Sequence, residues 1–183
     1  MVGLWEITMN RRFLLDLFVV DHSGTKVPVN MFGATEQDIE KTDSWMTYWG
    51  SDYILDSKHE NYAMKSKDDE LIALVSYEIM KNRLVVHIVY MESQPESNPV
   101  ITQDRKYRGI GKALIAFGIK LSVEHGFGGD VILEPKTDEL KAHYVNDFSG
   151  IVLPSFKGDI PCSILIADNA AVNIVSEYIA QEE

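Results

Sequence analysis

Apolar and polar positions in the first half of the chain predict short strands separated by turns. The run FLLDLFVV, residues 13–20, is interpreted as a first strand, although Asp16 interrupts it. Turn signals follow at Ser23-Gly24 and at Pro28. Three more apolar stretches come later, and the polar connections KDDE and KNR between them favour an antiparallel meander. These predicted strands are Tyr62–Ser66, Leu71–Met80 and Leu84–Glu92.

The stretch from Ala34 to Asp56 has a helical pattern. Thr35 and Ser44 are capping candidates and Gly50 interrupts the stretch, so two short helical pieces are expected. Its aromatic residues recur at intervals of three to four, which favours packing into the core over a wall for a ligand. They are Trp45, Tyr48, Trp49 and Tyr53.

The clearest helical pattern runs from about Gly109 to His125. One apolar stripe repeats at helical spacing, and a second stripe beside it predicts a helix that is covered on more than one side. Gly126 is a suitable C-terminal cap. The first stripe holds Ile110, Ala113, Leu114, Phe117 and Leu121, and the second holds Ile115, Ile119 and Val123.

After this helix the pattern alternates between strands and helices. DVILEP (residues 130–135) and CSILIAD (residues 162–168) are typical of strands, and Thr137 caps a helix between them, with two acidic residues in its first turn. A last helix begins at about Asp168, and its apolar side suits either a core cover or a dimer contact. Alternating elements after a meander predict an α/β (α+β) fold, a mixed sheet with helices on its faces.

Length and composition indicate one globular domain, residues 1–183, because 45% of the residues are hydrophobic and 25% are charged. Cys162 is the only cysteine, which excludes a disulfide framework and favours a reducing compartment. No apolar run approaches the ~18 residues of a membrane span, and residues 11–20 lack the cleavage site of a secretory signal. We therefore expect a soluble cytoplasmic protein with no membrane partner.

The charge balance disfavours nucleic acid as a partner. The formal net charge is −11, whereas phosphate backbones bind to basic faces. Most acidic excess serves solubility, although it also suits a cationic substrate. Against this background, Arg105, Lys106 and Arg108 gather directly before the predicted helix at Gly109.

These basic residues belong to the segment KYRGIGKAL, residues 106–114, which predicts an anion-binding cradle. Gly109 and Gly111 leave the backbone N–H groups accessible, and the start of a helix adds partial positive charge. Lys106, Arg108 and Lys112 add formal charge, as a diphosphate requires.

Spacing excludes two other phosphate motifs. A P-loop needs glycine where Lys106 stands and Ser or Thr where Ala113 stands. The dinucleotide fingerprint needs a third glycine at the position of Leu114.

KYRGIGKAL resembles the acetyl-CoA loop of the GNAT superfamily of N-acetyltransferases, whose consensus is Gln or Arg, two residues, Gly, one residue, then Gly or Ala. Gly109 and Gly111 match, and Lys106 replaces the Gln or Arg and keeps only the charge. The segment HYVNDFSG resembles the family's tyrosine-containing helix, with Tyr144 at the tyrosine. YMESQPESNP and PKTDELKAHY are similar to a bacterial subgroup of mostly uncharacterised acetyltransferases. The resemblance covers residues 60–153 well and the N-terminal third loosely.

The resemblance implies a GNAT-like mixed, mostly antiparallel twisted sheet flanked by helices. It also implies an N-acetyltransferase that uses acetyl-CoA as cosubstrate and acts by direct attack of an amine in a ternary complex, without a metal. Backbone groups of the strand before the loop would hold pantetheine, and the loop would hold the diphosphate. The implied cofactor-binding residues are Tyr90, Met91, Lys106, Tyr107, Arg108, Gly109, Ile110, Gly111 and Lys112.

Two residues are candidates for the chemistry. The attacking amine must lose a proton, and Glu92 at the end of its strand is the best base, with Glu78 and Glu134 as weaker ones. The departing thiolate has a pKa of about 8.5, so a phenol with a pKa of about 10 can donate to it, and Tyr144 takes that role. The alternatives are a solvated strand end for Glu92 and a core tyrosine for Tyr144.

Other functions remain open at this point. Lys106 and the long loop Ser93–Asp104 depart from the family pattern, which motivates an acyl-CoA-binding or protein-interaction module without catalysis. An interaction protein with an acidic surface is a third hypothesis. His87 in its apolar strand is interpreted as a core or substrate-side histidine and Cys162 as an inert buried thiol. The acceptor, a small molecule or a peptide or protein amine, and a possible homodimer are not determined by the sequence.

Overall fold

The computed structural model describes residues 14–154 and 162–179. Packing divides these residues into two units, which are described separately. Unit 1 holds residues 14–15, 79–89, 115–154 and 162–179, and unit 2 holds residues 16–78 and 90–114. The prediction of one domain stays a prediction.

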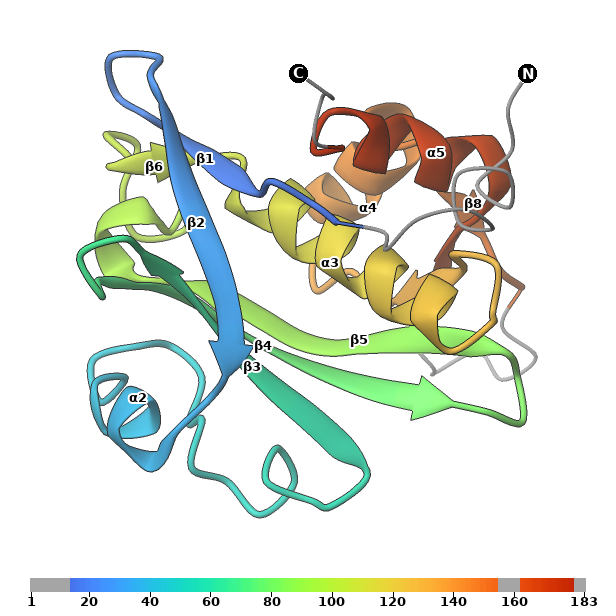
Figure 1. The fold of residues 1–183 in the computed structure, drawn as a ribbon, viewed down its shortest axis with the longest axis horizontal. Helices are drawn as coiled ribbons and strands as arrows, with labels where there is room; N and C mark the ends of the chain where they lie inside the picture. The colour runs from blue at the N-terminus through green and yellow to red at the C-terminus, as the bar shows by residue number, and fades with distance from the viewer. Residues whose placement is uncertain (1–13, 155–161, 180–183) are drawn as a thin grey trace. The chain divides into compact units, whose positions relative to one another are not determined.

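The described residues form both strands and helices (Figure 1). The strands are β1 (Phe18–Asp21), β2 (Lys26–Gly33), β3 (His59–Ser66), β4 (Leu71–Met80), β5 (Val85–Ser93), β6 (Tyr107–Arg108), β7 (Val131–Leu133), β8 (Ile151–Val152) and β9 (Ile164–Ile166). The helices are α2 (Glu36–Glu40), α3 (Ile110–Glu124), α4 (Asp138–Asn146) and α5 (Asp168–Ser176), with a short 3₁₀ turn, η1 (Pro95–Ser97).

The strand order is β6-β1-β2-β3-β4-β5-β7-β9-β8. β5 pairs with β7 in parallel, as expected for two strands joined through a helix. The pairs β1·β2, β1·β6, β2·β3, β3·β4, β7·β9 and β8·β9 are antiparallel. The predicted fold class, a mixed and mostly antiparallel sheet with helices, is confirmed.

Unit 2 is an antiparallel meander that packs against the segment after α2. The β1–β2 hairpin turns at Gly24, whose φ of +88° suits glycine. Thr35 caps α2 and forms a capping box with Asp38. A buried cluster fills the space between this segment and the strands. It contains Trp49, Ile54, Ala63, Leu71 and Leu74.

Unit 1 is built around a short strand, β7, in which all three residues are buried. β7 lies between β5 and β9, and the helices of this unit lie on one side of β5 (Figure 1). Ile174, Val175 and Tyr178, on the apolar side of the last helix and just after it, are buried. That side therefore covers core, which was one of the two roles predicted for it.

Local sequence signals are confirmed where one element carries a strong pattern. β4 has the predicted bounds, and α3 differs from its prediction by one residue at each end. Gly126 follows α3 with a φ of +78°, as a C-terminal cap requires. Ile115 and Ile119 of the second stripe are fully buried, which confirms that α3 is covered on more than one side.

The prediction of two helical pieces after Ala34 is half wrong. Thr35 starts a helix as expected, but residues 41–58 form turns, and no helix begins at Ser44. The aromatic residues divide accordingly: Trp49 is 2% exposed, whereas Tyr48 is 78% and Tyr53 is 54% exposed. Without a helix, their spacing no longer directs them to one face.

Two further predictions are wrong in position. Pro28 lies inside β2 instead of a turn, where β2 pairs with β1 and its register with β3 begins only at Val29. A missing N–H therefore interrupts no pairing with β3 there. Cys162 is partly exposed and precedes β9. The start of the predicted first strand, at Phe13, lies outside the described residues, and the observed β1 begins at Phe18.

Among the helices of the described segments, none is both long enough and apolar enough to cross a bilayer.

Candidate functional site

The start of α3 has two glycines that serve different purposes. Gly109 has a φ of +80°, a conformation that favours glycine, so the chain needs it to enter the helix. Gly111 lies in the first helical turn without a positive φ, and an added Cβ would meet no atom within 4 Å. Among the described residues, no contact outside the helix's own backbone and the neighbouring residues therefore requires glycine at position 111. An external group that approaches the backbone closely would require it.

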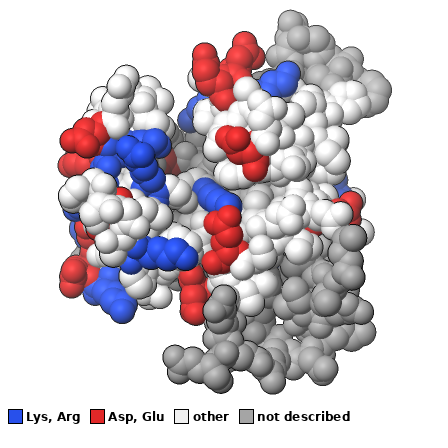
Figure 2. Space-filling view, turned by 90° about the horizontal axis from the view of Figure 1, so that it is seen from above, with Lys and Arg blue, Asp and Glu red and all other residues white. Residues whose placement is uncertain are grey.

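The charged side chains within and directly before this turn are basic. The first turn of α3 contains Lys112 and no acidic residue, although helix starts favour negative side chains. Arg108 in β6 is exposed directly before it. Figure 2 shows Lys and Arg side chains gathered at the end where Figure 1 places β6 and the β1–β2 hairpin, with Asp and Glu side chains beside them. The turn combines accessible N–H groups with cations, which suits an anion.

Two predicted anion ligands, Lys106 and Tyr107, are engaged inside the protein. The Lys106 ammonium lies 2.6 Å from a Glu70 carboxylate oxygen. The Tyr107 hydroxyl donates to the other Glu70 oxygen at 3.1 Å. Their backbone N–H groups are used as well, because Lys106 donates to the carbonyl of Glu96 and Tyr107 to the hydroxyl of Ser97.

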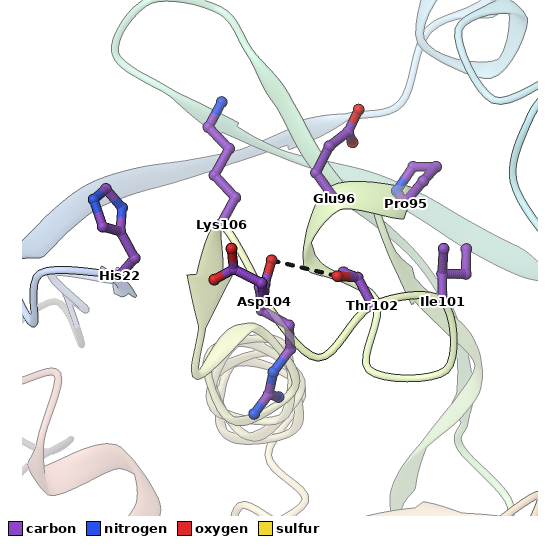
Figure 3. Close-up of a pocket in the computed structure, with 8 residues that line it drawn as sticks. His22, Pro95, Glu96, Ile101, Thr102, Asp104 and Lys106 are labelled. Carbon is purple, nitrogen blue, oxygen red and sulfur yellow. Dashed lines mark hydrogen bonds between the residues drawn. The ribbon is translucent and has the colours of Figure 1, made fainter.

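A pocket of about 630 Å³ lies in unit 2 beside this loop. Figure 3 shows that Lys106 points away from Asp104, to the side to which Glu96 also points. Thr102 donates to the Asp104 carbonyl at 3.4 Å, which closes the loop on itself. The lining residues are His22, Pro95, Glu96, Ile101, Thr102, Asp104, Arg105 and Lys106.

Tyr90 and Met91 lie in the second half of β5. The parallel register of β5 with β7 covers Val86–Ile88, so both residues lie beyond it. The Tyr90 ring meets the edge of Tyr53 at 6.3 Å between centroids and packs against the cluster around Trp49. These contacts fix the strand segment that the family resemblance assigns to pantetheine.

Glu92, the predicted base, binds the segment of residues 46–49 through its carboxylate. Its carboxylate accepts hydrogen bonds from the backbone N–H groups of Met46 at 2.7 Å and Thr47 at 3.0 Å. It also accepts one from the indole Nε1 of Trp49 at 3.1 Å. Both oxygens are therefore engaged by donors from one segment. Sequence spacing did not indicate this role, because the partners are 43 to 46 residues away.

Tyr144, the predicted proton donor, lies on α4 in unit 1 and is 6% exposed. Its ring stacks on Phe148 with 6.2 Å between centroids. Burial raises the pKa of Tyr144 to about 12, so the hydroxyl keeps its proton throughout the physiological range.

The weaker candidate Glu134 forms a cluster in unit 1 that the sequence did not predict. His87 Nε2 lies 2.6 Å from one of its oxygens, and Ser163 donates to the other at 3.0 Å. Burial alone would raise the pKa of Glu134, but the hydrogen bonds with His87 and Ser163 outweigh burial and lower it. His87 is thus a partner of a carboxylate. Glu78, the third candidate base, pairs with His59 in the β3–β4 register.

Unit 2 holds all the predicted cofactor-binding residues and Glu92, whereas Tyr144 belongs to unit 1. Within unit 2, Ile110 is buried, whereas its neighbours Gly109 and Gly111 are exposed. The residues missed by sequence reasoning are Glu70, Gln94 and Ser97, which tie the loop to the rest of unit 2. No local pattern marks them, since each contacts residues distant in sequence.

Solved structures of GNAT acetyltransferases share this fold. AAC(6')-Ib in a complex with acetyl-CoA is similar with a TM-score of 0.56 and 13% identity, over 79% of this chain and 96% of that one. A spermidine N-acetyltransferase from Vibrio cholerae is similar with a TM-score of 0.52 and 13% identity, over 76% of this chain and 93% of that one. A GNAT-family acetyltransferase from Staphylococcus aureus is similar with a TM-score of 0.50 and 13% identity, over 76% of this chain and 98% of that one. No protein-family model and no curated protein matches the sequence. The predicted GNAT fold is confirmed.

Proposed function

We propose that this protein transfers an acetyl group from acetyl-CoA to an amine by direct attack in a ternary complex. The observation that carries the proposal is Gly111, an exposed glycine in the first turn of α3 around which the described residues leave open space for a side chain. The first turn of α3 contains Lys112 and no acidic residue, Arg108 precedes it, and the fold is that of GNAT acetyltransferases. When bound, acetyl-CoA supplies the acetyl group as a thioester.

The residues at the start of α3 fit the diphosphate of CoA. The N–H groups of its first turn have no acceptor within the helix, and the helix dipole favours negative charge there. Arg108 and Lys112 supply formal charge beside them. By the family resemblance, the backbone at Tyr90 and Met91 would hold the pantetheine arm.

Tyr144 would act on the departing sulfur as a hydrogen-bond donor. Its pKa of about 12 lies well above the value of about 8.5 for a thiol, so transfer of its proton is unfavourable. A hydrogen bond from a neutral phenol still stabilises the developing thiolate. Tyr144→Phe should lower turnover at least about tenfold and leave CoA affinity unchanged. An unchanged rate would remove Tyr144 from the mechanism.

Glu92 has two proposed roles that one variant separates. As the base it would accept the proton of the amine, and as an anchor it holds residues 46–49. Glu92→Gln removes the base and places an amide N–H opposite backbone donors. Lost turnover with an unchanged unfolding midpoint supports the base. A lowered midpoint together with a raised KM for the amine supports the anchor, and loss of turnover alone contradicts it.

A second candidate function is an acyl-CoA-binding module without catalysis. The observation that favours it is the engagement of both Glu92 oxygens, which occupies the best candidate base. Tight CoA binding without thioester cleavage, for every amine tested, would establish this function and contradict the transferase.

The acceptor is proposed only as an amine, on a small molecule or on a peptide or protein. Spermidine is a suitable first probe, because the similar structure from Vibrio cholerae is a spermidine N-acetyltransferase. A cytoplasmic location, the absence of a nucleic-acid or metal partner and a homodimer stay predictions.

Cofactor binding is tested by thermal unfolding with acetyl-CoA, CoA and ATP. Ligand at ~100 times its Kd adds about 2.7 kcal/mol, which raises the unfolding midpoint by roughly 5–10 °C. We expect this shift with both CoA species and none with ATP. A shift with ATP alone or no shift at all would contradict the proposed function.

The direct-attack mechanism is tested by two-substrate kinetics with an accepted amine. A ternary complex predicts intersecting initial-rate lines and no acetyl group on the protein by mass spectrometry. Parallel lines with an acetylated protein indicate a covalent intermediate and would overturn this part of the proposal.

A further inference from the structure

Glu70, at the end of the β3–β4 connection, accepts three hydrogen bonds in unit 2. Lys106 Nζ lies 2.6 Å from its Oε1, and Gln94 Nε2 donates to the same atom at 2.9 Å. The Tyr107 hydroxyl donates to Oε2 at 3.1 Å. One carboxylate therefore ties β4 to the residue after β5 and to the residues that lead into α3.

These contacts determine the path of the chain before α3. Residues 106 and 107 are also held by backbone hydrogen bonds to Glu96 and Ser97, and β6 pairs with β1. Gly109 and the first turn of α3 follow directly. The position of the start of α3 thus depends on the loop before it, which Glu70 holds through hydrogen bonds to Lys106 and Tyr107.

The same contacts change the role of Lys106. An ammonium 2.6 Å from a carboxylate is already neutralised, so a phosphate would have to compete with Glu70 for it. Its backbone N–H is used by Glu96. Arg108 in β6 and Lys112 in the first helical turn flank Gly109 and Gly111 and supply charge at the turn itself.

We propose, on the premise that the protein binds CoA, that Glu70 is a positioning residue for the start of α3. Lys106 is then a structural residue of this loop, called a strut below, whose ammonium pairs with Glu70 and does not bind the diphosphate. Lys106 occupies the Gln or Arg position of the family consensus, and here its side chain serves the protein. Arg108 and Lys112 then remain as the basic residues at the turn itself.

A charge swap tests the proposal. Glu70→Lys and Lys106→Glu are made singly and together, and CoA affinity is measured by calorimetry beside the thermal unfolding midpoint. Each single variant places like charges in contact and should lower CoA affinity by about tenfold, the loss expected for one charged hydrogen bond. The double variant restores an ion pair. Gln94 and Tyr107 can accept as well as donate, so they also suit an ammonium at position 70.

A strut predicts that the double variant recovers both the midpoint and the affinity, the latter to within about threefold of the wild type. Recovery of the midpoint with affinity still about tenfold low would mean that Lys106 contacts the phosphate, and would overturn the proposal. Wild-type affinity in both single variants would overturn the positioning role of Glu70.

Salt dependence gives a second readout with a matched control. A ligand of the diphosphate contributes to the weakening of CoA binding by salt, whereas a strut does not. Lys106→Met should keep the wild-type salt dependence, and Lys112→Met should reduce it. The reverse result contradicts the proposal. If the wild-type protein binds no CoA, the proposed function fails. If the wild type binds CoA but the double variant does not recover its affinity, only the structural role of Lys106 is overturned.

Discussion

Helices α3 and α4 each follow a loop, yet their first turns are built differently. Thr137 caps α4 by accepting from the N–H of Leu140 at 3.2 Å, and two acidic residues occupy its first turn. α3 follows Gly109, which has no side chain to cap it, and carries Lys112 where an acid would be favourable. The start of α2 resembles that of α4, with its own Thr cap and acids.

The difference separates stability from function. Ser, Thr, Asp and Asn caps and first-turn acids satisfy a helix start from within the chain. A helix start without such caps and acids has N–H groups and a positive dipole end that another partner can satisfy. The start of α3 is therefore suited to an anion supplied from outside, whereas the start of α4 satisfies itself.

The largest effect should come from Gly111→Leu. Leucine is a good helix former and has open space there, so the unfolding midpoint should hold. Its side chain would cover the N–H groups, and CoA affinity should fall more than about a hundredfold, ~2.7 kcal/mol. Calorimetric titration measures this. Glu139→Leu, at the same helical position in α4, should leave CoA affinity unchanged. Retained affinity in Gly111→Leu would refute the cradle.

Lys112→Glu should move stability and affinity in opposite directions. An acid in the first turn of α3 suits the dipole and should stabilise the fold by about 0.3–1 kcal/mol. The same charge opposes the diphosphate, and CoA affinity should fall about tenfold. Unfolding midpoints and titrations report both. The reverse change in α4, Glu139→Lys, should lower stability and spare affinity. If both properties of Lys112→Glu fall together, the contrast between the two helices is wrong.

Thr137→Ala should affect stability alone. Loss of the cap typically costs about 1 kcal/mol, which lowers the unfolding midpoint by roughly 2–4 °C for a chain of this size. CoA affinity should stay at the wild-type value, as measured in the same titration. A large loss of affinity would show that α4 takes part in binding and would weaken the comparison.

The smallest effect concerns pH and the loop before α3. Burial alone would raise the pKa of Glu70, but hydrogen bonds from Lys106, Gln94 and Tyr107 outweigh it and lower the pKa. A carboxyl group with a lowered pKa stabilises the fold above its ordinary value of 4.5, and this contribution is lost as the pH falls through the lower folded-state value.

Glu70→Gln should therefore flatten the fall in stability below about pH 4.5, measured by denaturant unfolding between pH 3 and 7. Thr137→Ala should keep the wild-type slope, because a threonine cap does not titrate. Equal slopes in the wild type and Glu70→Gln would contradict the assignment.

Elements with a strong local pattern could be predicted from the sequence. α3 carries two apolar stripes bounded by glycines, and β4 is a long apolar run. β2 was missed because Pro28 reads as a turn, and only the register shows that the proline lies where β1 is the paired neighbour. The expected helix at Ser44 is absent, and the contacts that hold this segment join Met46, Thr47 and Trp49 to Glu92, far away in the sequence. Tertiary contacts override propensity there.

The candidate site divides in the same way. The glycines and cations at the start of α3 are contiguous in sequence, so their pattern is visible. The Glu70–Lys106 pair joins residues 36 positions apart, and the His87–Glu134 pair joins residues 47 apart. Such partners come together only in the tertiary fold, which single-sequence patterns do not encode. The sequence therefore predicts a cradle at the start of α3, but it does not predict the contacts of Glu70 that hold the preceding loop.

The most direct test of the account is a titration of ¹⁵N-labelled protein with CoA, followed through backbone amide shifts. An anion held by the first turn of α3 predicts that the amides of Ile110, Gly111 and Lys112 shift with a common Kd, while those of Asp138 and Glu139 in α4 stay in place. Binding that leaves the amides of Ile110 to Lys112 unmoved would contradict the central claim.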